Sequence, residues 1–386
     1  MTIGIVGAGQ LGRMLALAGY PLGLDFLFLD RGADTPAGRV APVLAGRLDD
    51  PALLAELARR CDIISFDWEN VPVQALQRAV RAARGSRATR GPRVAPPVRA
   101  LAAAQDRLVE KRTFERLAIP TTRFAAVDSR AALERAARRI GLPGVLKTRR
   151  LGYDGKGQQV LRRPADLDAA WQRLGGVPLL YEQFVPFDYE VSIIGARARD
   201  GSTAIYPLNR NLHHAGILRL TLAPWPAARL ERAAATALRR VLQTYRYVGV
   251  LAIEFFVHRG RLLANEMAPR VHNSGHWSIE GAVTSQFENH LRAITGLPLG
   301  STAPRGHAAM INLIGTLPAA RTLLAETGLH WHDYGKDPRE GRKLGHCTLV
   351  ETSATRRDAR ARALLARLYP DLAQLPAWPH PAHVRP

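Results

Sequence analysis

Three glycines fall within six positions of the segment Gly152-Tyr153-Asp154-Gly155-Lys156-Gly157, which Gln158 follows. Such glycines are costly in a purely structural turn, because glycine loses more conformational freedom on folding than any other residue. They make sense where bare backbone N–H groups must close over an anion. With Lys147 and Lys156 on either side, the segment predicts a mobile lid over nucleotide phosphates. A Gly-rich hairpin turn with a solvated lysine is the structural alternative.

Lysine is rare in this chain, and its positions are informative. Of 54 basic residues only five are lysines: Lys111, Lys147, Lys156, Lys336 and Lys343. Where arginine is the default, a retained lysine indicates a need for a compact ammonium that a planar guanidinium does not replace. Three of the five lie in motifs that stand out for other reasons, and we expect Lys111 to be a chance survivor.

An acidic hairpin is the second candidate site. A strand at 251–257 is followed by a turn at 258–261 and a returning strand at 262–266. A three-residue loop would place Glu254 opposite Glu266, and a two-residue loop would place Asn265 there instead. Facing carboxylates on a sheet repel each other, and a Mg²⁺ between them would reverse that effect. The alternative is an exposed acidic face without a ligand.

Several polar segments carry further candidates. The loop at 268–276 gathers an arginine, two histidines, an asparagine and a serine around a glycine, with little apolar content to form a core. Loops of this kind usually bind a ligand. The segment 66–70 ends a strand, where ligands bind in α/β folds. Glycine and cations combine at 341–346 as expected around a phosphate. Each of these segments also has a plain structural interpretation, as a surface loop or a helix cap.

The N-terminus contains Gly7-x-Gly9-x-x-Gly12 after an apolar strand, and Asp30 ends the next strand. This meets the stated form of the dinucleotide-binding fingerprint, so a nicotinamide-dependent oxidoreductase is a fair hypothesis. Two observations oppose it: only three clear strands precede the proline-rich stretch at 85–99, and no later segment supplies a dehydrogenase-like catalytic group. We therefore expect the helix N-terminus to receive a substrate phosphate instead.

The elements that position these residues alternate between strand and helix in the first 85 residues, which indicates a parallel sheet. A helix is expected over 100–118, followed by a strand, a helix at 130–140, the strand that leads to Lys147, and a helix at 165–174. Several strands and a helix at 227–245 follow from 189 onward. We predict an N-terminal Rossmann-like domain (1–99), a central subdomain with the lid (100–187) and a C-terminal subdomain with the metal and substrate residues (188–386).

Composition limits the class of protein. A net charge of +21 invites a nucleic-acid interpretation, but the arginines are spread over the expected helices and no nucleic-acid motif is present. Cys61 and Cys347 lie far apart with no paired spacing, which fits a reducing compartment. No apolar run approaches the roughly 20 residues that span a bilayer. We expect a cytoplasmic protein without nucleic-acid or membrane partners.

Together these segments resemble the ATP-grasp superfamily and, within it, the N5-carboxyaminoimidazole ribonucleotide synthases of purine biosynthesis. The resemblance runs from 9–14 to 341–346, and its most specific parts are 152–158 and 265–276, together with 284–288. It implies an α/β and α+β chain with an ATP-grasp fold. Departures from the family pattern are Gln183, where a second acid is common, and Val271, where proline is frequent. The stretch 331–336 is slightly expanded, so Lys336 is left unassigned.

The resemblance also implies site residues. ATP is expected to contact Arg107, Lys147, Gly152, Tyr153, Asp154, Gly155, Lys156, Gly157, Gln158, Glu182, Gln183, Phe184, Val185, Glu190, His213, Asn265 and Glu266. The metal, Mg²⁺ or alternatively Mn²⁺, is expected on Glu254 and Glu266. The substrate is expected at Gln10, Leu11, Glu69, Asp154, Arg270, His272, Asn273, Ser274 and Lys343, of which Asp154, Arg270 and Lys343 are the catalytic candidates.

The implied activity is the ATP-dependent carboxylation of 5-aminoimidazole ribonucleotide with bicarbonate, through carboxyphosphate, in a homodimeric ligase. Bicarbonate is a poor electrophile, and phosphorylation by ATP activates it. Another ATP-grasp ligase, such as a folate-independent formyltransferase that uses formate, and the nicotinamide-dependent oxidoreductase are the alternative hypotheses.

Overall fold

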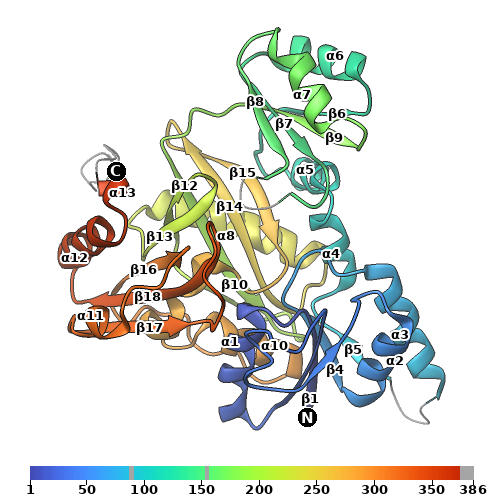
Figure 1. The fold of residues 1–386 in the computed structure, drawn as a ribbon, viewed down its shortest axis with the longest axis vertical. Helices are drawn as coiled ribbons and strands as arrows, with labels where there is room; N and C mark the ends of the chain where they lie inside the picture. The colour runs from blue at the N-terminus through green and yellow to red at the C-terminus, as the bar shows by residue number, and fades with distance from the viewer. Residues whose placement is uncertain (87–90, 153–155, 374–386) are drawn as a thin grey trace.

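The first unit of the fold is a parallel sheet at the N-terminus. The computed structural model describes residues 1–86, 91–152 and 156–373, and Figure 1 shows this sheet at the lower end of the molecule. Its elements are β1 (Thr2–Val6), α1 (Gln10–Gly19), β2 (Asp25–Asp30), β3 (Val43–Ala45), α2 (Pro51–Arg60), β4 (Ile63–Phe66), α3 (Val73–Ser86) and β5 (Arg93–Val94), with a short 3₁₀ turn at Tyr20–Leu22. The strand order is β3-β2-β1-β4-β5.

This sheet has five strands: β3 lies before the proline-rich stretch at 85–99 in addition to the three strands expected there, and β5 lies within that stretch. The two strands that the sequence did not reveal, β3 and β5, contain three and two residues. Strands this short show no periodic pattern of apolar side chains, so only their pairing with β2 and β4 identifies them. The sheet is packed on both faces, because Ile3 and Ile5 contact the core that includes α1, whereas Val6 and Ile64 contact the core that includes α2 and α3.

The helix expected over 100–118 is two helices, α4 (Val98–Ala104) and α5 (Arg107–Arg116). The break lies at Asp106, whose carboxylate accepts the N–H groups of Leu108 and Val109 at 3.0 and 3.4 Å and so caps α5. The same carboxylate pairs with Arg149 through two hydrogen bonds of 3.0 and 2.6 Å. This pairing ties the start of α5 to the segment that leads into the glycine-rich loop.

The second unit is a small four-stranded sheet with its own core, at the upper end of Figure 1. Its elements are β6 (Phe124–Val127), α6 (Arg130–Ile140), β7 (Gly144–Thr148), β8 (Gln158–Leu161), α7 (Asp166–Leu174) and β9 (Leu179–Gln183), in the strand order β6-β9-β7-β8. The antiparallel pair β7 and β8 flanks the glycine-rich loop. Tyr153, Asp154 and Gly155 of the predicted lid lie outside the described residues. The structure describes the two strands on either side of them, β7 and β8.

The third unit is a nine-stranded antiparallel sheet in the order β15-β14-β10-β12-β13-β16-β18-β17, with β11 beside β10. The strands are β10 (Tyr189–Arg197), β11 (Thr203–Ile205), β12 (Asn209–His214), β13 (Ile217–Ala223), β14 (Gly249–His258), β15 (Arg261–Ala268), β16 (His307–Ile314), β17 (Leu329–Asp333) and β18 (Lys343–Glu351). The helices are α8 (Ala228–Thr244), α9 (Ser278–Gly281), α10 (Gln286–Thr295), α11 (Ala320–Leu324), α12 (Ala354–Leu368) and α13 (Pro370–Ala373). A 3₁₀ turn spans Asn273–Gly275.

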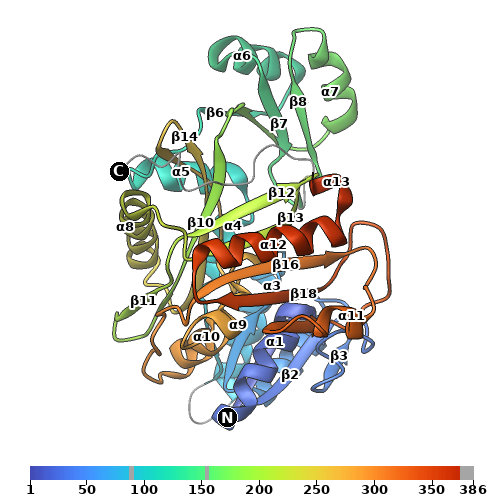
Figure 2. The same cartoon turned by 90° about the vertical axis from the view of Figure 1, so that its left-hand side faces the viewer.

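Alternation along β14 shows how this sheet is buried and how it presents the site. Leu251 and Ile253 pack into the core that contains α8 and α12, and Figure 2 shows α12 lying across β16 and β18. Val250 and Ala252 face the opposite core, which contains α10 and α1. Because side chains two residues apart share a face of a strand, Glu254 lies on the face of α10 and α1, beyond the edge of that core.

The three sheets lie one in each of the ranges 1–99, 100–187 and 188–386. The exact domain boundaries stay predictions. None of the helices in the described parts of the chain is both long and apolar enough to cross a bilayer.

A buried histidine joins the first and third units. His290 on α10 accepts the Val250 N–H on Nδ1 at 3.2 Å, which leaves Nε2 to donate to Ser65 Oγ of β4 at 3.1 Å. Burial lowers the pKa of His290 to about 4. Its stabilising effect is therefore complete above the unfolded pKa of about 6.5 and is lost as the pH falls toward 4.

We expect His290→Gln to weaken the acid sensitivity of folding, because glutamine cannot take up the proton. Between pH 6.5 and 4 the wild type should lose about 1.4 kcal/mol per pH unit through this histidine, in addition to losses from the buried His276 and His346, whose pKa values burial also lowers. Urea unfolding from pH 7.5 to 4.5 measures the slope. A variant with the wild-type slope would contradict this role.

Candidate active site

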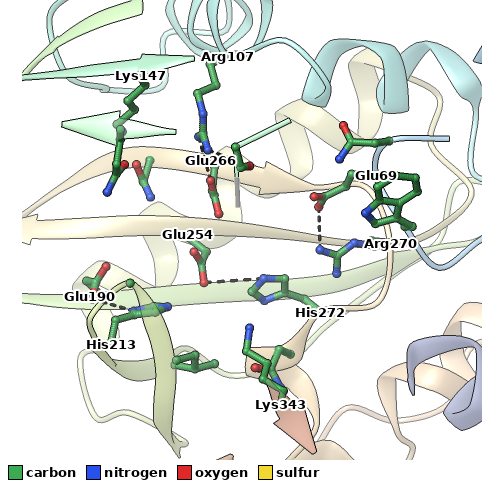
Figure 3. Close-up of a pocket in the computed structure, with 18 of the residues that line it drawn as sticks. Glu69, Arg107, Lys147, Glu190, His213, Glu254, Glu266, Arg270, His272 and Lys343 are labelled. Atoms are coloured by element: carbon green, nitrogen blue, oxygen red, sulfur yellow. Dashed lines mark hydrogen bonds and ion pairs between the residues drawn. The ribbon is translucent and has the colours of Figure 1, made fainter. Parts of the chain in front are cut away.

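One cleft of about 910 Å³ is lined by residues from all three sheets and their connecting segments. Figure 3 shows its charged side chains, which converge from strands, loops and the start of α5. Most of the predicted site residues line it: Gln10, Leu11, Glu69, Arg107, Lys147, Gly152, Gln158, Glu182, Gln183, Phe184, Val185, Glu190, His213, Glu254, Asn265, Glu266, Arg270, His272, Asn273 and Lys343. Lys156, Gly157 and Ser274 are not among the lining residues. Tyr153, Asp154 and Gly155 lie outside the described part of the chain.

The register of the acidic hairpin combines features of both alternatives that the sequence left open. His258 pairs with Arg261, so the loop has two residues, yet Glu254 still pairs with Glu266. Both hold because the register shifts between Glu254 and Phe255, where Asn265 is the extra residue of a β-bulge. Ala264 pairs with Phe255 and Glu266 pairs with Glu254, so Asn265 is the residue of β15 that the bulge leaves out of the ladder.

The donor set of this hairpin fits Mg²⁺. Glu254 Oε1 and Asn265 Oδ1 are buried oxygen atoms that have no hydrogen-bond partner among the residues the structure describes. Among residues 1–86, 91–152 and 156–373, no group of three or more His, Cys, Asp or Glu side chains is arranged to hold a metal ion. Two carboxylates are nevertheless the usual protein contribution to a magnesium ion that also contacts substrate phosphates.

The two carboxyl groups of this pair differ in their electrostatic surroundings. Burial raises the pKa of Glu254 to about 8 against the opposing charge of His213, and the negative charge of Glu266 adds a smaller increase. Burial alone would raise the pKa of Glu266, but the charge and hydrogen bond of Arg107 at 3.1 Å, together with the charges of Lys147 and His213, lower it. In the absence of metal the pair therefore favours one proton on Glu254.

Lys147 reaches the cleft from β7 and is held by a buried carboxylate. Its Nζ lies 3.1 Å from Glu182 Oε2, and Lys111 Nζ lies 3.7 Å from the same oxygen. Burial alone would raise the pKa of Glu182, but the two lysines lower it to about 2. The expectation that Lys111 is a chance survivor was wrong: its ammonium is fully buried and donates to Thr121 Oγ1 and Ala264 O at 3.1 and 3.0 Å.

Glu190 and His213 form a pair in the cleft, from the neighbouring strands β10 and β12. The distance from His213 Nδ1 to Glu190 Oε2 is 2.8 Å. Burial lowers the pKa of His213, but the hydrogen bond and the charge of Glu190 outweigh it and raise the pKa to about 9. Gln183 stands where the resemblance leads us to expect a second acid. Its Oε1 accepts a hydrogen bond from Arg123 Nε at 3.2 Å, so the amide has a charged partner.

The other half of the cleft holds a second set of charges. Arg270 Nη2 lies 2.9 Å from Glu69 Oε1, which joins the loop after β15 to the end of β4. His272 turns its Nε2 toward Glu254, 3.9 Å from Oε1 (Figure 3). Lys343 lines the same half at the start of β18. This half thus offers two cations, one acid and a neutral imidazole, since burial lowers the pKa of His272 well below its usual value.

Ser274, a predicted substrate contact, lies behind this surface instead of on it. It is fully buried, and its Oγ accepts a hydrogen bond from Ser192 Oγ at 2.8 Å. Its hydroxyl is then free to donate to His272 Nδ1, also at 2.8 Å. The Ser274 N–H contacts the same nitrogen at 3.3 Å. Ser274 therefore fixes the imidazole tautomer that carries its proton on Nε2, the atom facing the cleft.

Two amides of the glycine turn at Gly7–Gly12 are already bound by a carboxylate of the protein itself, and the expectation of a substrate phosphate at this helix N-terminus stays a prediction. Asp67 Oδ2 accepts the N–H groups of Gly9 and Gly12 at 2.7 and 3.1 Å. A Cβ on Gly7, which has φ +99°, would lie 1.8 Å from Asp67 Oδ1. Asp30 accepts the Ala8 N–H at 2.7 Å. The place of a dinucleotide pyrophosphate is taken by carboxylates, which argues against the oxidoreductase hypothesis.

Lys336 is a cation of this region that the sequence left unassigned. Its Nζ donates to Gln10 Oε1 at 2.5 Å. Burial lowers its pKa to about 8. The expanded spacing of 331–336 hid this position, and the lysine count was the one available signal.

Comparison with known proteins gives consistent results along the chain. Residues 1–105 match the ribonucleotide synthetase preATP-grasp domain, residues 112–287 the ATP-grasp domain, and residues 308–360 the phosphoribosylaminoimidazole carboxylase C-terminal domain. A protein of Pseudomonas aeruginosa named N5-carboxyaminoimidazole ribonucleotide synthase is 50% identical over 349 residues, which cover 90% of this chain and 94% of that protein.

Two solved structures extend the comparison. The crystal structure of N5-carboxyaminoimidazole ribonucleotide synthetase from Thermus thermophilus is 48% identical with a TM-score of 0.88, over 97% of this chain and 99% of that chain. An Aspergillus clavatus N5-carboxyaminoimidazole synthase in complex with ADP and 5-aminoimidazole ribonucleotide is 25% identical with a TM-score of 0.86, over 95% and 98%.

Proposed function

The chain belongs to the N5-carboxyaminoimidazole ribonucleotide synthase family, and from this premise we propose that it carboxylates 5-aminoimidazole ribonucleotide with bicarbonate and ATP. The observation that carries the proposal is the single cleft in which the nucleotide half (Arg107, Lys147, Glu254 and Glu266) meets a second charged half around Arg270. An ATP-dependent ligase needs both halves within reach of one another, because the activated acid must meet the amine before water does.

The nucleotide half of the cleft binds ATP. Lys147 and Arg107 bring positive charge to the phosphates, and Glu190 accepts from the ribose hydroxyls while His213, charged at neutral pH, holds it in place. Glu182, Gln183, Phe184 and Val185 line the end of the cleft where the base lies. Glu254, Glu266 and the amide oxygen of Asn265 would hold Mg²⁺, which neutralises phosphate charge when it is bound.

Two covalent steps follow from this arrangement. A bicarbonate oxygen attacks the γ-phosphorus, the bond to the β-phosphate oxygen breaks, and carboxyphosphate and ADP result. The substrate amine then forms a bond to the carboxyl carbon, either of carboxyphosphate or of carbon dioxide released from it. Phosphate leaves, and the amine loses a proton. Arg270 and Lys343 supply positive charge to the anionic intermediate and substrate, and Glu69 fixes the guanidinium of Arg270.

The substrate half is proposed to hold the ribonucleotide through Gln10, Leu11, Glu69, Arg270, His272, Asn273 and Lys343. Asn273 is fixed by two hydrogen bonds with Asn312, of 3.0 and 2.7 Å. Lys336, beside Gln10, adds an ammonium near the start of α1. We assign Ser274 to the support of His272.

Product analysis tests the function. ADP should form only when ATP, 5-aminoimidazole ribonucleotide and bicarbonate are all present, and ¹⁸O from labelled bicarbonate should enter the released phosphate. Glycinamide ribonucleotide with formate should give no ADP above background, and titration with a nicotinamide dinucleotide should show no binding. ADP formation with formate would favour the formyltransferase, and tight dinucleotide binding would favour the oxidoreductase.

We expect Asp154→Asn to reduce turnover at least about 100-fold while the KM for ATP changes little. Asp154 is proposed to orient the substrate amine when the lid is closed, which affects the second step and not nucleotide binding. Steady-state kinetics in both substrates measure the two effects, and Asp166→Asn in the same subdomain is the control. Wild-type turnover in Asp154→Asn would contradict this role.

We also propose a cytoplasmic homodimer. Cys61 and Cys347 are both buried, and the structure pairs neither with the other, which fits a reducing compartment; the dimer rests on the family. Sedimentation equilibrium with and without ATP tests the oligomeric state, and a monomer at micromolar concentration would contradict it.

A further inference from the structure

The strand that carries Asn265 and Glu266 lies at the edge of its sheet. β15 pairs with β14 on one side and with no long strand on the other; an isolated bridge between Thr121 and Ala264 is its outer pairing. The backbone groups on the outer side of an edge strand need other partners. A β-bulge interrupts the inner ladder of β15 at Asn265 as well. The two proposed nucleotide-site residues thus lie where the sheet itself constrains the backbone least.

Helix α5 supplies the missing partners from two consecutive side chains. Glu110 Oε1 accepts the Met267 N–H at 2.6 Å, and Lys111 Nζ donates to Ala264 O at 3.0 Å. These two backbone groups flank Asn265 and Glu266 on either side. Thr121 Oγ1 also donates to Ala264 O, at 2.6 Å. The bulge is therefore held at both of its ends by side chains from outside the sheet.

Burial shows that these contacts are more than incidental. The exposed fractions of Glu110 and Lys111 are 2% and 1%. Burying a polar side chain is costly unless hydrogen bonds replace its contacts with water, and apolar side chains of similar size would fill the same space without that cost. The two polar groups are therefore best explained by what they bind, which is the backbone of β15 for Glu110 and that backbone together with Glu182 for Lys111.

Lys111 also connects the bulge with the ATP lysine. Its Nζ is 3.7 Å from Glu182 Oε2, which lies 3.1 Å from Lys147 Nζ. One turn before Glu110 on the same helix, Arg107 pairs with Glu266 at 3.1 Å. One helix thus contacts the backbone on both sides of the bulge, one of its carboxylates, and the acid that holds Lys147.

We propose that Glu110 and Lys111 are positioning residues of the nucleotide site, which hold the β15 backbone at Met267 and Ala264 and so fix the direction of Asn265 and Glu266 toward the metal. The inference rests on the proposed function only in that the site binds a magnesium-nucleotide complex. It applies to the metal-dependent part of nucleotide binding, whatever acid the enzyme activates.

The test is therefore a binding measurement that does not require turnover. Calorimetry with a non-hydrolysable ATP analogue, once with Mg²⁺ and once with EDTA, gives the ratio of the two affinities for each variant. Glu110→Met removes the acceptor for the Met267 N–H, and Lys111→Met removes the donor to Ala264 O at nearly constant volume. Each should reduce the ratio about 10- to 100-fold, the range for residues that orient metal ligands.

Matched variants separate positioning from stability. Glu110→Gln keeps an oxygen that accepts the Met267 N–H, so it should retain most of the wild-type ratio. Thr113→Val removes a buried hydroxyl of the same helix that bonds to Val109 O at 2.8 Å, so it should lower the thermal midpoint and leave the ratio unchanged. If a methionine variant does not fold, Thr121→Val weakens the same anchor on Ala264 more mildly, with an expected reduction of about 3-fold.

The outcomes are distinct. Methionine variants or Thr121→Val with lower thermal midpoints but the wild-type ratio would overturn the proposal, because they would show a purely structural role. A wild-type protein that binds the analogue equally well with Mg²⁺ and EDTA would overturn the metal site itself. Metal-dependent binding without product from 5-aminoimidazole ribonucleotide and bicarbonate would refute the proposed reaction and leave this inference standing.

Discussion

Glu254→Gln is expected to lower kcat at saturating ATP and Mg²⁺ by about 100-fold or more while the ligand-free protein becomes more stable at alkaline pH. The loss of activity follows from removing one of two carboxylates that would hold the metal, because charge stabilisation around a transferring phosphoryl group supplies much of the rate. Steady-state kinetics over a range of Mg²⁺ concentrations measure it.

The gain in stability has a defined sign. Burial and the charge of Glu266 raise the pKa of Glu254 above its unfolded value. A carboxyl group whose pKa is raised on folding stabilises the fold fully below the unfolded pKa, and this contribution is lost as the pH rises through the folded pKa. Glutamine resembles the protonated form and has no such loss. Thermal midpoints from pH 5 to 9 without metal or nucleotide should therefore fall less steeply for Glu254→Gln than for the wild type.

Glu288→Gln is the matched control for this prediction. Glu288 pairs with Arg292 on α10, outside the cleft, so its replacement should leave kcat and the magnesium dependence unchanged. Wild-type turnover in Glu254→Gln at saturating Mg²⁺ would exclude Glu254 as a metal ligand. A steeper fall in stability at alkaline pH would show that its carboxylate is charged and paired in the free protein.

Lys147→Met is expected to raise the KM for ATP about 10- to 100-fold, because an ion-to-phosphate hydrogen bond contributes roughly 1.5–3 kcal/mol. The fold should persist, since Glu182 keeps Lys111 as a charged neighbour at 3.7 Å. Lys147→Arg should restore little of the affinity, because a planar guanidinium does not reproduce a compact ammonium in a buried site. Isothermal titration with ATP and Mg²⁺ measures the affinities.

The control for Lys147 is Arg173→Met on α7, an exposed cation of the same small subdomain. It tests whether the loss of any positive charge there weakens nucleotide binding through the general field of the protein. We expect its affinity for ATP to equal that of the wild type at physiological ionic strength, where exposed charges are screened. Normal ATP affinity in Lys147→Met would refute the assignment of this lysine to the phosphates.

Local patterns in the sequence predict part of the fold. Strand-helix alternation predicted the parallel sheet. The sequence did not predict β8, whose antiparallel pairing with β7 is equally compatible with the hairpin alternative, so the lid stays a prediction. Glu254 faces Glu266, one of the two alternatives that the hairpin left open. The alternation that indicates a parallel sheet depends on neighbours in the sequence, so periodicity was sufficient for it, whereas the choice between the two hairpin registers was not.

The features that were missed depend on distant contacts. The bulge at Asn265 breaks no apolar pattern, so the register could not be derived from loop length. The helix break at Asp106 follows from its capping bonds and its pairing with Arg149. The role of Lys111 requires Ala264, 153 positions away. Nothing in a single helical segment indicates which of its charged side chains another part of the chain will bury.

The carboxylate of Asp67 in the turn at Gly7–Gly12 bears on how glycine fingerprints are interpreted in other chains. The glycines indicate a tight strand-to-helix turn whose backbone N–H groups bind a negatively charged group. They do not indicate whether that group belongs to a ligand or to the protein. Here the partner comes from the adjacent strand, 55 to 58 residues further on. In a chain of this architecture, the residue directly after that neighbouring strand should therefore be checked for an aspartate or glutamate before a nicotinamide cofactor is assigned.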